Sequence, residues 1–546
     1  MVIVSLFKNF GKSLKSEFSG YNGKKFGMDL LAGVTVAAVA LPLALAFGVS
    51  SGATAAAGLV TAILAGVVIG GLSGGSYQIS GPTGAMTAIL ATLVVKYGIK
   101  GVFIACFISG VILLLAGLFK MGALVSFIPV PVITGFTSGI AIIIALGQID
   151  NLSGLTGSGT TTIEKIVSYF TTPQSVNVTS LIIGLAVILF MAVYPKKANA
   201  VLPSSLVAII LATAVNMIVG FDVNVVGEIP KTLFLQDRLT FDMFDLKTVE
   251  SLIAPAISIA ALGLIESLLC GASAGRMKNE KLDADRELVA QGIGNMIIPF
   301  FGGVPATAAI ARTSVAIKAG GQTRLTSVVH SGVLLLSMFV LGGVMSKIPL
   351  SALAGVLIVT AWRMNEWHVI KDIFGKKIKS AISQFLITMA ATVVFDLTIA
   401  IVIGISFSLI LFVIKVSDIQ ITTSDIDPKK LSDATKYNEN HKKTSVIYIT
   451  GPLYFGTTGK LEQKLSEHDN KEIFIFSMRG VTFADISGVQ ALESLCMQLH
   501  DEGKTVYFTC VQPDVMKMFS RLGFSETIGE KYFYWSTNEV LLELGD

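Results

Sequence analysis

The sequence predicts a polytopic α-helical membrane protein with a small soluble α/β domain at its C-terminal end. Two observations predict this fold class. Only 14% of the 546 residues are charged and 52% are hydrophobic, whereas soluble domains carry about 25% charged residues. The charge is also uneven, because 31 of the 78 charged side chains lie in residues 421–546. The first 420 residues therefore have the composition of a protein dissolved in lipid, and the tail that of a soluble domain.

Charge-free stretches mark the membrane-spanning part. No charged side chain occurs from Leu30 to Val95, which at about 20 residues per crossing leaves room for three helices. A signal peptide is excluded, because its apolar core is only about 7 to 15 residues long. Further charge-poor stretches follow as far as residue 414. With the shorter ones counted as broken helices, we expect about fourteen crossings.

Lysine and arginine positions predict the orientation. Five lysines lie in residues 1–27, and the other predicted inward loops are basic, whereas the loop from 222 to 250 leans acidic. The positive-inside rule therefore predicts both termini in the cytoplasm and a multi-pass protein of the cell inner (plasma) membrane. The predicted parts are an N-terminal segment (1–27), a transmembrane domain (28–416), a linker (417–444) and a cytoplasmic domain (445–546).

Charge and cysteine content exclude other classes. The net charge of +4 averages a basic membrane part and an acidic tail, so it does not indicate a nucleic-acid-binding protein. The four cysteines form no CxxC pair and have no histidine at zinc spacing. We therefore expect no metal site, no disulfide framework and no cofactor.

Two short segments place glycine and proline where an apolar helix should continue without interruption. They are Gln78–Met86 and Gly302–Thr313. By our span count, each is the third crossing of its half of the chain. Broken segments at matching positions in two halves indicate the binding site of an inverted-repeat transporter. The alternative is a pair of proline kinks in packed helices.

The same segments predict an anion site. Half-helices that start near Pro82 and Pro305 would turn their N–H groups and positive dipole ends toward a common cavity, which favours an anion. Threonine offers hydroxyl donors there, and small residues let a ligand approach the backbone. The predicted substrate-binding residues are Thr83, Gly84, Ala306, Thr307, Ala308 and Arg312.

Two charged residues stand alone in apolar spans. Glu266 is the only charge in residues 251–275, and Arg312 is the only one in residues 288–317. A charge near the bilayer centre costs at least about 2.5 kcal/mol, so each needs a partner or a wet cavity. Glu266 is the predicted coupling-ion residue. Burial would make it a proton carrier and pairing with Arg312 would make it a structural counter-ion, and both alternatives stay open.

The polar tail alternates short apolar runs with a helical pattern. Residues 445–450, 472–476 and 505–510 are predicted strands, and residues 488–500 are a predicted helix. Strand, helix and strand in this order indicate an α/β domain with at least one parallel pair. The tail contains no Walker-type loop, no GxGxxG and no triad spacing, so we expect no enzyme. A regulatory or assembly module with a cytoplasmic partner fits better.

Several motifs together resemble one family. They are the stretch Ala40–Ala53, the Ser80-Gly-Pro-Thr-Gly84 turn, Ile265-Glu-Ser-Leu-Leu-Cys270, and Gln291-Gly-Ile-Gly-Asn295 leading into Gly303–Thr313. This combination resembles the sulfate permease (SulP) family of anion transporters. Residues 445–546, with Phe483-Ala-Asp-Ile-Ser-Gly488, resemble the STAS domain that this family carries at its C-terminus.

The resemblance implies an architecture and a site. It implies two intertwined seven-span inverted repeats, divided into a core and a gate domain, with the anion between the third and tenth spans. It also implies a homodimer and an elevator-like movement of the core. Thr83 and Thr307 match anion-site positions of the family, Arg312 matches its tenth-span arginine, and Glu266 matches its eighth-span acidic position.

Departures from one branch of the family narrow the predicted function. Sodium-coupled bicarbonate members have Asp at the position of Glu266 and Thr at that of Cys270, and they lack the arginine. A thiol is also a poor ligand for a hard cation. We therefore expect a secondary active transporter of small anions (sulfate, C4-dicarboxylate or bicarbonate) coupled to protons. The alternatives are a sodium-coupled bicarbonate transporter and a passive anion channel or exchanger.

Overall fold

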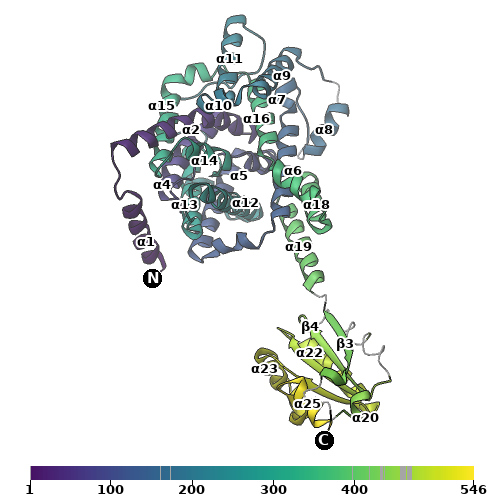
Figure 1. The fold of residues 1–546 in the computed structure, drawn as a ribbon. Helices are drawn as coiled ribbons and strands as arrows, with labels where there is room; N and C mark the ends of the chain where they lie inside the picture. Colours follow the sequence, from purple (N-terminus) through teal and green to yellow (C-terminus); the bar gives the residue numbers. More distant parts are fainter. Residues whose placement is uncertain are drawn as a thin grey trace. The chain divides into compact units, whose positions relative to one another are not determined.

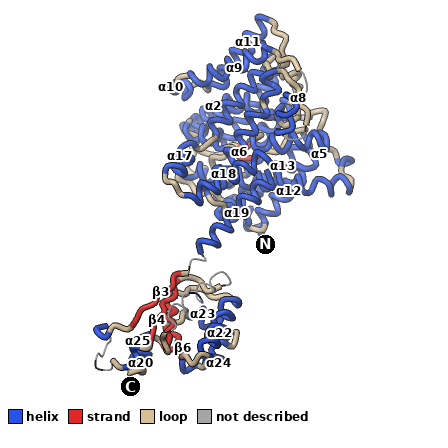
Figure 2. Tube along the Cα trace, turned by 90° about the vertical axis from the view of Figure 1, so that its right-hand side faces the viewer, coloured by secondary structure: helices blue, strands red, loops and turns tan. Residues whose placement is uncertain are grey.

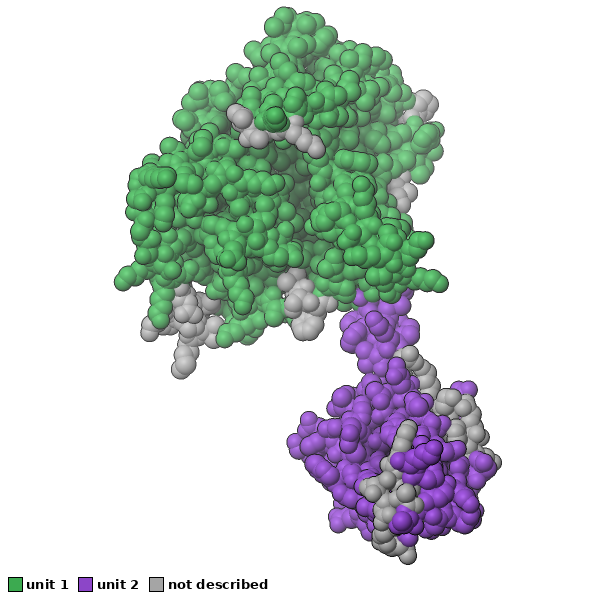
Figure 3. Space-filling model, in the orientation of Figure 1, with its two compact units in different colours: residues 1–406 green, residues 407–546 purple. Residues whose placement is uncertain are grey.

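The computed structural model describes residues 2–159, 162–171, 174–395, 397–416, 419–430, 437–454 and 470–545, together with residues 435 and 463. The chain divides into two compact units, coloured separately in Figure 3. Residues 1–406 form the first, called here the membrane unit, and residues 407–546 form the C-terminal unit.

The membrane unit is built of helices (Figure 1). They are α1 (Val2–Glu17), α2 (Gly23–Ser50), α3 (Ala55–Leu64), η1 (Ala65–Ile69), α4 (Gly70–Leu72), α5 (Gly84–Leu118), η2 (Met121–Phe127), α6 (Val130–Gly147), α7 (Ile149–Ser153), α8 (Thr162–Thr171), α9 (Val178–Val193), α10 (Lys196–Val201), α11 (Ser204–Val219), η3 (Phe241–Met243), α12 (Leu246–Lys278), α13 (Ala284–Ile297), η4 (Ile298–Phe301), α14 (Ile310–Lys318), α15 (Leu325–Met345), α16 (Leu350–Met364), α17 (Trp367–Gly375), α18 (Lys379–Val394) and α19 (Leu397–Val416), whose end belongs to the C-terminal unit.

Many of these helices are apolar enough for lipid. Seven in the described residues are long and apolar enough to cross a membrane, and four shorter apolar helices accompany them. The longest, α5, is two helical parts that meet at Gly98, where φ is +69°. The structure confirms the predicted fold class, and the count of fourteen crossings stays a prediction.

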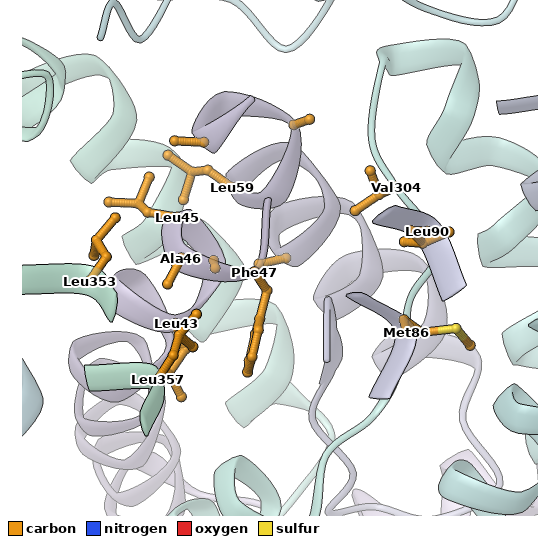
Figure 4. Packing of buried hydrophobic residues seen from close by; sticks show 14 of the residues in the cluster. Leu43, Leu45, Ala46, Phe47, Leu59, Met86, Leu90, Val304, Leu353 and Leu357 are labelled. Carbon is orange, nitrogen blue, oxygen red and sulfur yellow. The ribbon is translucent and has the colours of Figure 1, made fainter. Parts of the chain in front are cut away.

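Small and apolar residues fill the interior of the membrane unit. Figure 4 shows Leu45 of α2, Leu59 of α3 and Val304 in the main buried cluster. A Cβ atom at Gly58 would collide with the carbonyl oxygen of Ala44, so α2 and α3 can approach this closely only because residue 58 is glycine. Close backbone contact of this kind stabilises helix packing in a membrane. Lipid tails are as apolar as the side chains, so moving an apolar side chain from lipid into the protein yields little free energy.

The two broken segments pair with each other as short strands. β1 (Ser80–Gly81) and β2 (Thr307–Ala308) are antiparallel, with Ser80 opposite Ala308 and Gly81 opposite Thr307. Figure 2 shows this pair in red among the helices of the membrane unit. The pair joins the two halves of the chain at the predicted site.

The half-helices begin at different distances from their prolines. α5 begins at Gly84, two residues after Pro82, as expected. α14 begins only at Ile310, five residues after Pro305. The difference arises because residues 307–308 pair across to β1 instead of forming the first turn of a helix. Arg312 consequently lies in the first turn of α14.

The C-terminal unit contains one five-stranded sheet in the order β3-β4-β5-β6-β7. β3 is antiparallel to β4, and the other neighbours are parallel. The elements are β3 (Gln420–Asp425), η5 (Pro428–Lys430), α20 (Glu439–Lys442), β4 (Thr444–Thr450), β5 (Ile473–Gly480), α22 (Ile486–Asp501), β6 (Thr505–Thr509), α23 (Pro513–Arg521), α24 (Phe524–Ile528), η7 (Glu530–Tyr532), β7 (Phe533–Tyr534) and α25 (Thr537–Glu543).

This sheet confirms the strand, helix and strand predicted for the tail, and it adds two strands. β3 lies inside the predicted linker 417–444, so part of that segment belongs to the sheet. The unit has its own apolar core, in which Phe476, Phe508 and Phe519 are fully buried.

A buried carboxylate ties the start of α2 to the connection between α14 and α15. Asp29 is fully buried and accepts hydrogen bonds from the N–H groups of Gln322 (2.6 Å) and Thr323 (3.0 Å). The hydroxyls of Thr323 (2.6 Å), Thr326 (2.9 Å) and Tyr21 (2.9 Å) also donate to it. Burial and the bond to Asp29 raise the pKa of Tyr21 to about 12, so this hydroxyl remains a donor at neutral pH.

We expect Asp29→Ala to destabilise the protein, because it leaves five buried or partly buried donors without their acceptor. The expected loss is on the order of 3 kcal/mol in the free energy of unfolding. Asp372→Ala is the control, since its exposed ion pair with Lys376 (3.2 Å) is worth less than about 1 kcal/mol. Thermal unfolding of the purified protein in detergent measures both, and equal shifts for the two variants would contradict the role of Asp29.

Candidate functional site

Three of the predicted site residues meet at one carboxylate oxygen. Oε2 of Glu266, on α12, accepts a hydrogen bond from the hydroxyl of Thr307 at 2.6 Å and from that of Thr83 at 2.8 Å. The two hydroxyl oxygens lie 3.2 Å apart. Thr83 and Thr307 are buried, and Glu266 keeps part of its side chain accessible. The structure thus joins Glu266 of α12 to both broken segments.

Local backbone geometry explains why these groups converge. Thr83 is the extended residue before α5 (φ −128°, ψ 157°), and its side chain does not cap the helix, which leaves the hydroxyl for Glu266. The pairing of β1 with β2 sets Thr307 opposite Gly81, two residues before Thr83. The carboxylate therefore lies beside the N-terminal end of α5, where the helix dipole favours negative charge.

Arg312 is a buried cation, with 1% of its surface exposed. Neither of its Nη atoms has a hydrogen-bond partner among the residues that the structure describes. Nη1 lies close to Gly81, since a Cβ atom there would be 2.7 Å away. Arg312 and Glu266 both lie in the described part of the chain, and no ion pair within 4.0 Å joins them, although they interact electrostatically at longer range. A buried guanidinium in this state is suited to hold an incoming anion.

The predicted small residues Gly84, Ala306 and Ala308 contribute close packing and internally bonded N–H groups, whereas the threonines contribute hydroxyl donors. A side chain at Gly84 would collide with Ile144 of α6, so α6 packs against the start of α5. The N–H group of Ala306 donates to Oδ1 of Asn295 at 2.8 Å, and that of Ala308 donates to Oγ of Ser267 at 3.3 Å. These N–H groups are therefore bound within the protein, and the hydroxyls are the donors that face Glu266.

Sequence reasoning missed several polar residues that support the two segments. Nε2 of Gln78 donates to the carbonyl oxygen of Ser267 at 2.8 Å. Oγ1 of Thr313 accepts from the N–H of Ile79 at 3.0 Å and lies 3.4 Å from Sγ of Cys270. The sequence feature that could have identified these residues is a neutral polar side chain within an apolar span. Within the described residues, no group of three or more His, Cys, Asp or Glu could hold a metal ion.

A cavity with a mixed polar and apolar lining begins one helical turn beyond Thr83 and extends along α5 to Val95. Its volume is about 80 Å³, and Thr87 of α5, Gln148 after α6 and Lys165 of α8 contribute polar groups to its lining. This volume accommodates several waters or one small anion. Nζ of Lys165 lies 3.9 Å from Asp150. The cavity thus has a lysine and hydroxyl groups in its lining beside α5, and it includes none of the predicted site residues.

Comparison with known families covers both units. The model described as "Sulfate permease family" matches residues 26–391, and the model described as "STAS domain" matches residues 436–539. "Putative sulfate transporter YvdB" of Bacillus subtilis is 35% identical over 542 residues, which cover 96% of this chain and 98% of that protein. "Bicarbonate transporter BicA" of a Picosynechococcus species is 28% identical over 523 residues, which cover 90% and 91%.

Two solved structures share the fold. The transmembrane domain of a cyanobacterial bicarbonate transporter, BicA, is similar at a TM-score of 0.64 and 28% identity, over 70% of this chain and 98% of that one. The murine Slc26a9 anion transporter matches at a TM-score of 0.82 and 19% identity, over 97% and 93%. These matches confirm the resemblance drawn from the motifs: the chain belongs to the sulfate permease family of anion transporters and carries a STAS domain at its C-terminal end.

Proposed function

We propose that this protein is a secondary active transporter that couples the movement of a small anion to protons. The candidate anions are sulfate, a C4-dicarboxylate and bicarbonate. The observation that carries the proposal is the Glu266 carboxylate held by the hydroxyls of Thr83 and Thr307 between the two broken segments. The site moves with the core in an elevator-like step.

The hydrogen bonds at Glu266 supply a reason for coupling. Each threonine hydroxyl has one proton, and the ionised carboxylate draws both protons toward itself. An arriving anion needs the same donors and meets a like charge. Protonation removes that charge and frees a hydroxyl proton to turn toward the anion. Anion and proton therefore bind together, and Glu266 in its ionised form competes with the substrate.

The charge balance of the site distinguishes the substrates. With Glu266 ionised and Arg312 cationic, the two side chains sum to zero. Adding one proton and one monovalent anion leaves the sum at zero, so neither form carries net charge across the hydrocarbon region. A divalent anion with one proton leaves one negative charge. Bicarbonate transport is thus electroneutral, and sulfate transport moves charge.

Three further features complete the proposal. The basic predicted inward loops favour cytoplasmic termini and a position in the plasma membrane. The family resemblance favours a homodimer. The compact C-terminal unit, which matches the STAS model, favours a cytoplasmic partner.

We expect the protein in liposomes to accumulate labelled sulfate, fumarate or bicarbonate when the outside is more acidic than the inside. Sodium should make no difference, and an inside-positive voltage should accelerate sulfate uptake but not bicarbonate uptake. Radiotracer uptake measures both effects. Failure of all three anions to accumulate would overturn the proposal. Uptake driven by sodium alone would favour the sodium-coupled alternative, and non-saturating currents would favour a channel.

We expect Glu266→Gln to uncouple transport from protons. Glutamine keeps the size and the acceptor oxygen of a protonated glutamate, so anion exchange across the membrane should continue. Accumulation driven by the pH gradient should disappear. Glu250→Gln is the matched control, because Glu250 is exposed near the start of the same helix. Unchanged gradient-driven accumulation in Glu266→Gln would eliminate Glu266 as the proton site.

We expect Arg312→Met to weaken anion binding. The substitution keeps a long apolar side chain and removes the buried positive charge, so KM for the anion should rise roughly tenfold or more. Arg363→Met is the control: Nη2 of Arg363 donates to the carbonyl oxygen of Met191 at 2.8 Å, away from the site. Uptake kinetics at several anion concentrations measure KM, and an equal rise in both variants would contradict a specific role for Arg312.

A further inference from the structure

The segment that leads into β2 is held by side chains. Oγ1 of Thr61, on α3, accepts from the N–H of Val304 at 2.7 Å. It lies 2.8 Å from the carbonyl oxygen of Ala57 in its own helix and 3.0 Å from that of Val304. Asn295, on α13, binds both backbone groups of Ala306. Oδ1 of Asn295 accepts from the N–H of Ala306 at 2.8 Å, and Nδ2 donates to the carbonyl oxygen of Ala306 at 3.0 Å. Each side chain therefore contacts both polar groups of one residue.

This arrangement replaces strand neighbours that the segment lacks. β2 is two residues long and belongs to a two-stranded sheet, so the residues before it cannot extend a ladder. Buried backbone groups must still be hydrogen-bonded, and Val304 and Ala306 are fully buried. Pro305 between them has no N–H to satisfy. A Cβ atom at Gly303 would lie only 2.8 Å from Oγ1 of Thr61, so glycine leaves space for this hydroxyl.

The same face of α13 also reaches the first segment. Glu287, Gln291 and Asn295 are four residues apart and so lie on one face of the helix. Nε2 of Gln291 donates to Oγ of Ser80 in β1 at 3.0 Å and to Oε1 of Glu287 at 2.9 Å. Oε2 of Glu287 accepts from the N–H of Gly74 at 2.9 Å. One helix face thus contacts both broken segments.

We propose that Thr61 and Asn295 are positioning residues, which hold residues 304–306 and thereby keep the hydroxyl of Thr307 against Glu266. Neither side chain touches Glu266 in the described structure, and each acts through the backbone next to Thr307. The proposal rests on the proposed function in one respect, because the misplaced hydroxyl is expected to weaken anion binding. Its structural part is independent of transport.

Thr61→Val and Thr61→Ser separate the hydroxyl from the volume of the side chain. Valine has the shape of threonine without the hydroxyl, and serine keeps the hydroxyl. Thr213→Val is the matched control, because the one hydrogen bond that Oγ1 of Thr213 makes to the described residues is to the carbonyl oxygen of Ile209 in its own helix. Asn295→Ala tests the second positioning residue. All four variants are made in the full-length chain and compared with the unchanged protein in detergent and in liposomes.

Hydrogen exchange followed by mass spectrometry tests the structural part. Peptides that cover residues 302–309 should exchange faster in Thr61→Val and Asn295→Ala than in the unchanged protein. They should keep their protection in Thr61→Ser and Thr213→Val. Unchanged protection in both Thr61→Val and Asn295→Ala would overturn the proposal, whether or not the protein transports any anion.

Uptake kinetics test the link to the site. KM for the transported anion should rise about 10-fold to 100-fold in Thr61→Val, with a smaller change in the maximal rate, and Thr61→Ser should restore it. Faster exchange without a change in KM would overturn the positioning of the anion site. If the unchanged protein transports none of the three anions, the proposed function fails, and the exchange result still decides whether these side chains hold the segment.

Discussion

The structure of the membrane unit depends on one constraint: polar groups at the depth of the hydrocarbon region must find their partners inside the protein. Glu266 finds two hydroxyls, and the interrupted backbone of the two broken segments is satisfied by β1, β2 and a small number of side chains. The interruption places the hydroxyls of Thr83 and Thr307 against Glu266, and side chains of the surrounding helices satisfy part of the backbone that it leaves unpaired.

The two charges of the site differ in how they are accommodated. Oε2 of Glu266 accepts hydrogen bonds from two threonine hydroxyls, whereas Nη1 and Nη2 of Arg312 have no hydrogen-bond partner among the described residues. A pair in direct contact would stabilise the empty site and oppose substrate. Under the proposed function, this separation would leave the cation available to an anion and would let the acid respond to protons.

The sequence was sufficient where the signal is local. Thr83, Thr307 and Glu266 stand out because proline, glycine or a lone charge interrupts an apolar span, and the fold class follows from composition. The late start of α14 at Ile310 was not predictable, because it depends on pairing with residues more than 200 positions away. In the sequence, Thr61 and Asn295 look like ordinary helix residues. β3 was not predicted, because its residues are largely exposed and its alternation of apolar and polar residues is weak.

The pairing of β1 with β2 also sets a delay during synthesis of the chain, because the two strands are made at different times. Gly81 and Thr307 lie 226 positions apart, and at a synthesis rate of about 5–20 residues per second the second strand follows the first by roughly 10 to 45 s. During that interval the first broken segment has entered the membrane without the strand that completes it. The nascent first half must therefore be sheltered by water, lipid head groups or an insertion machinery until its counterpart arrives.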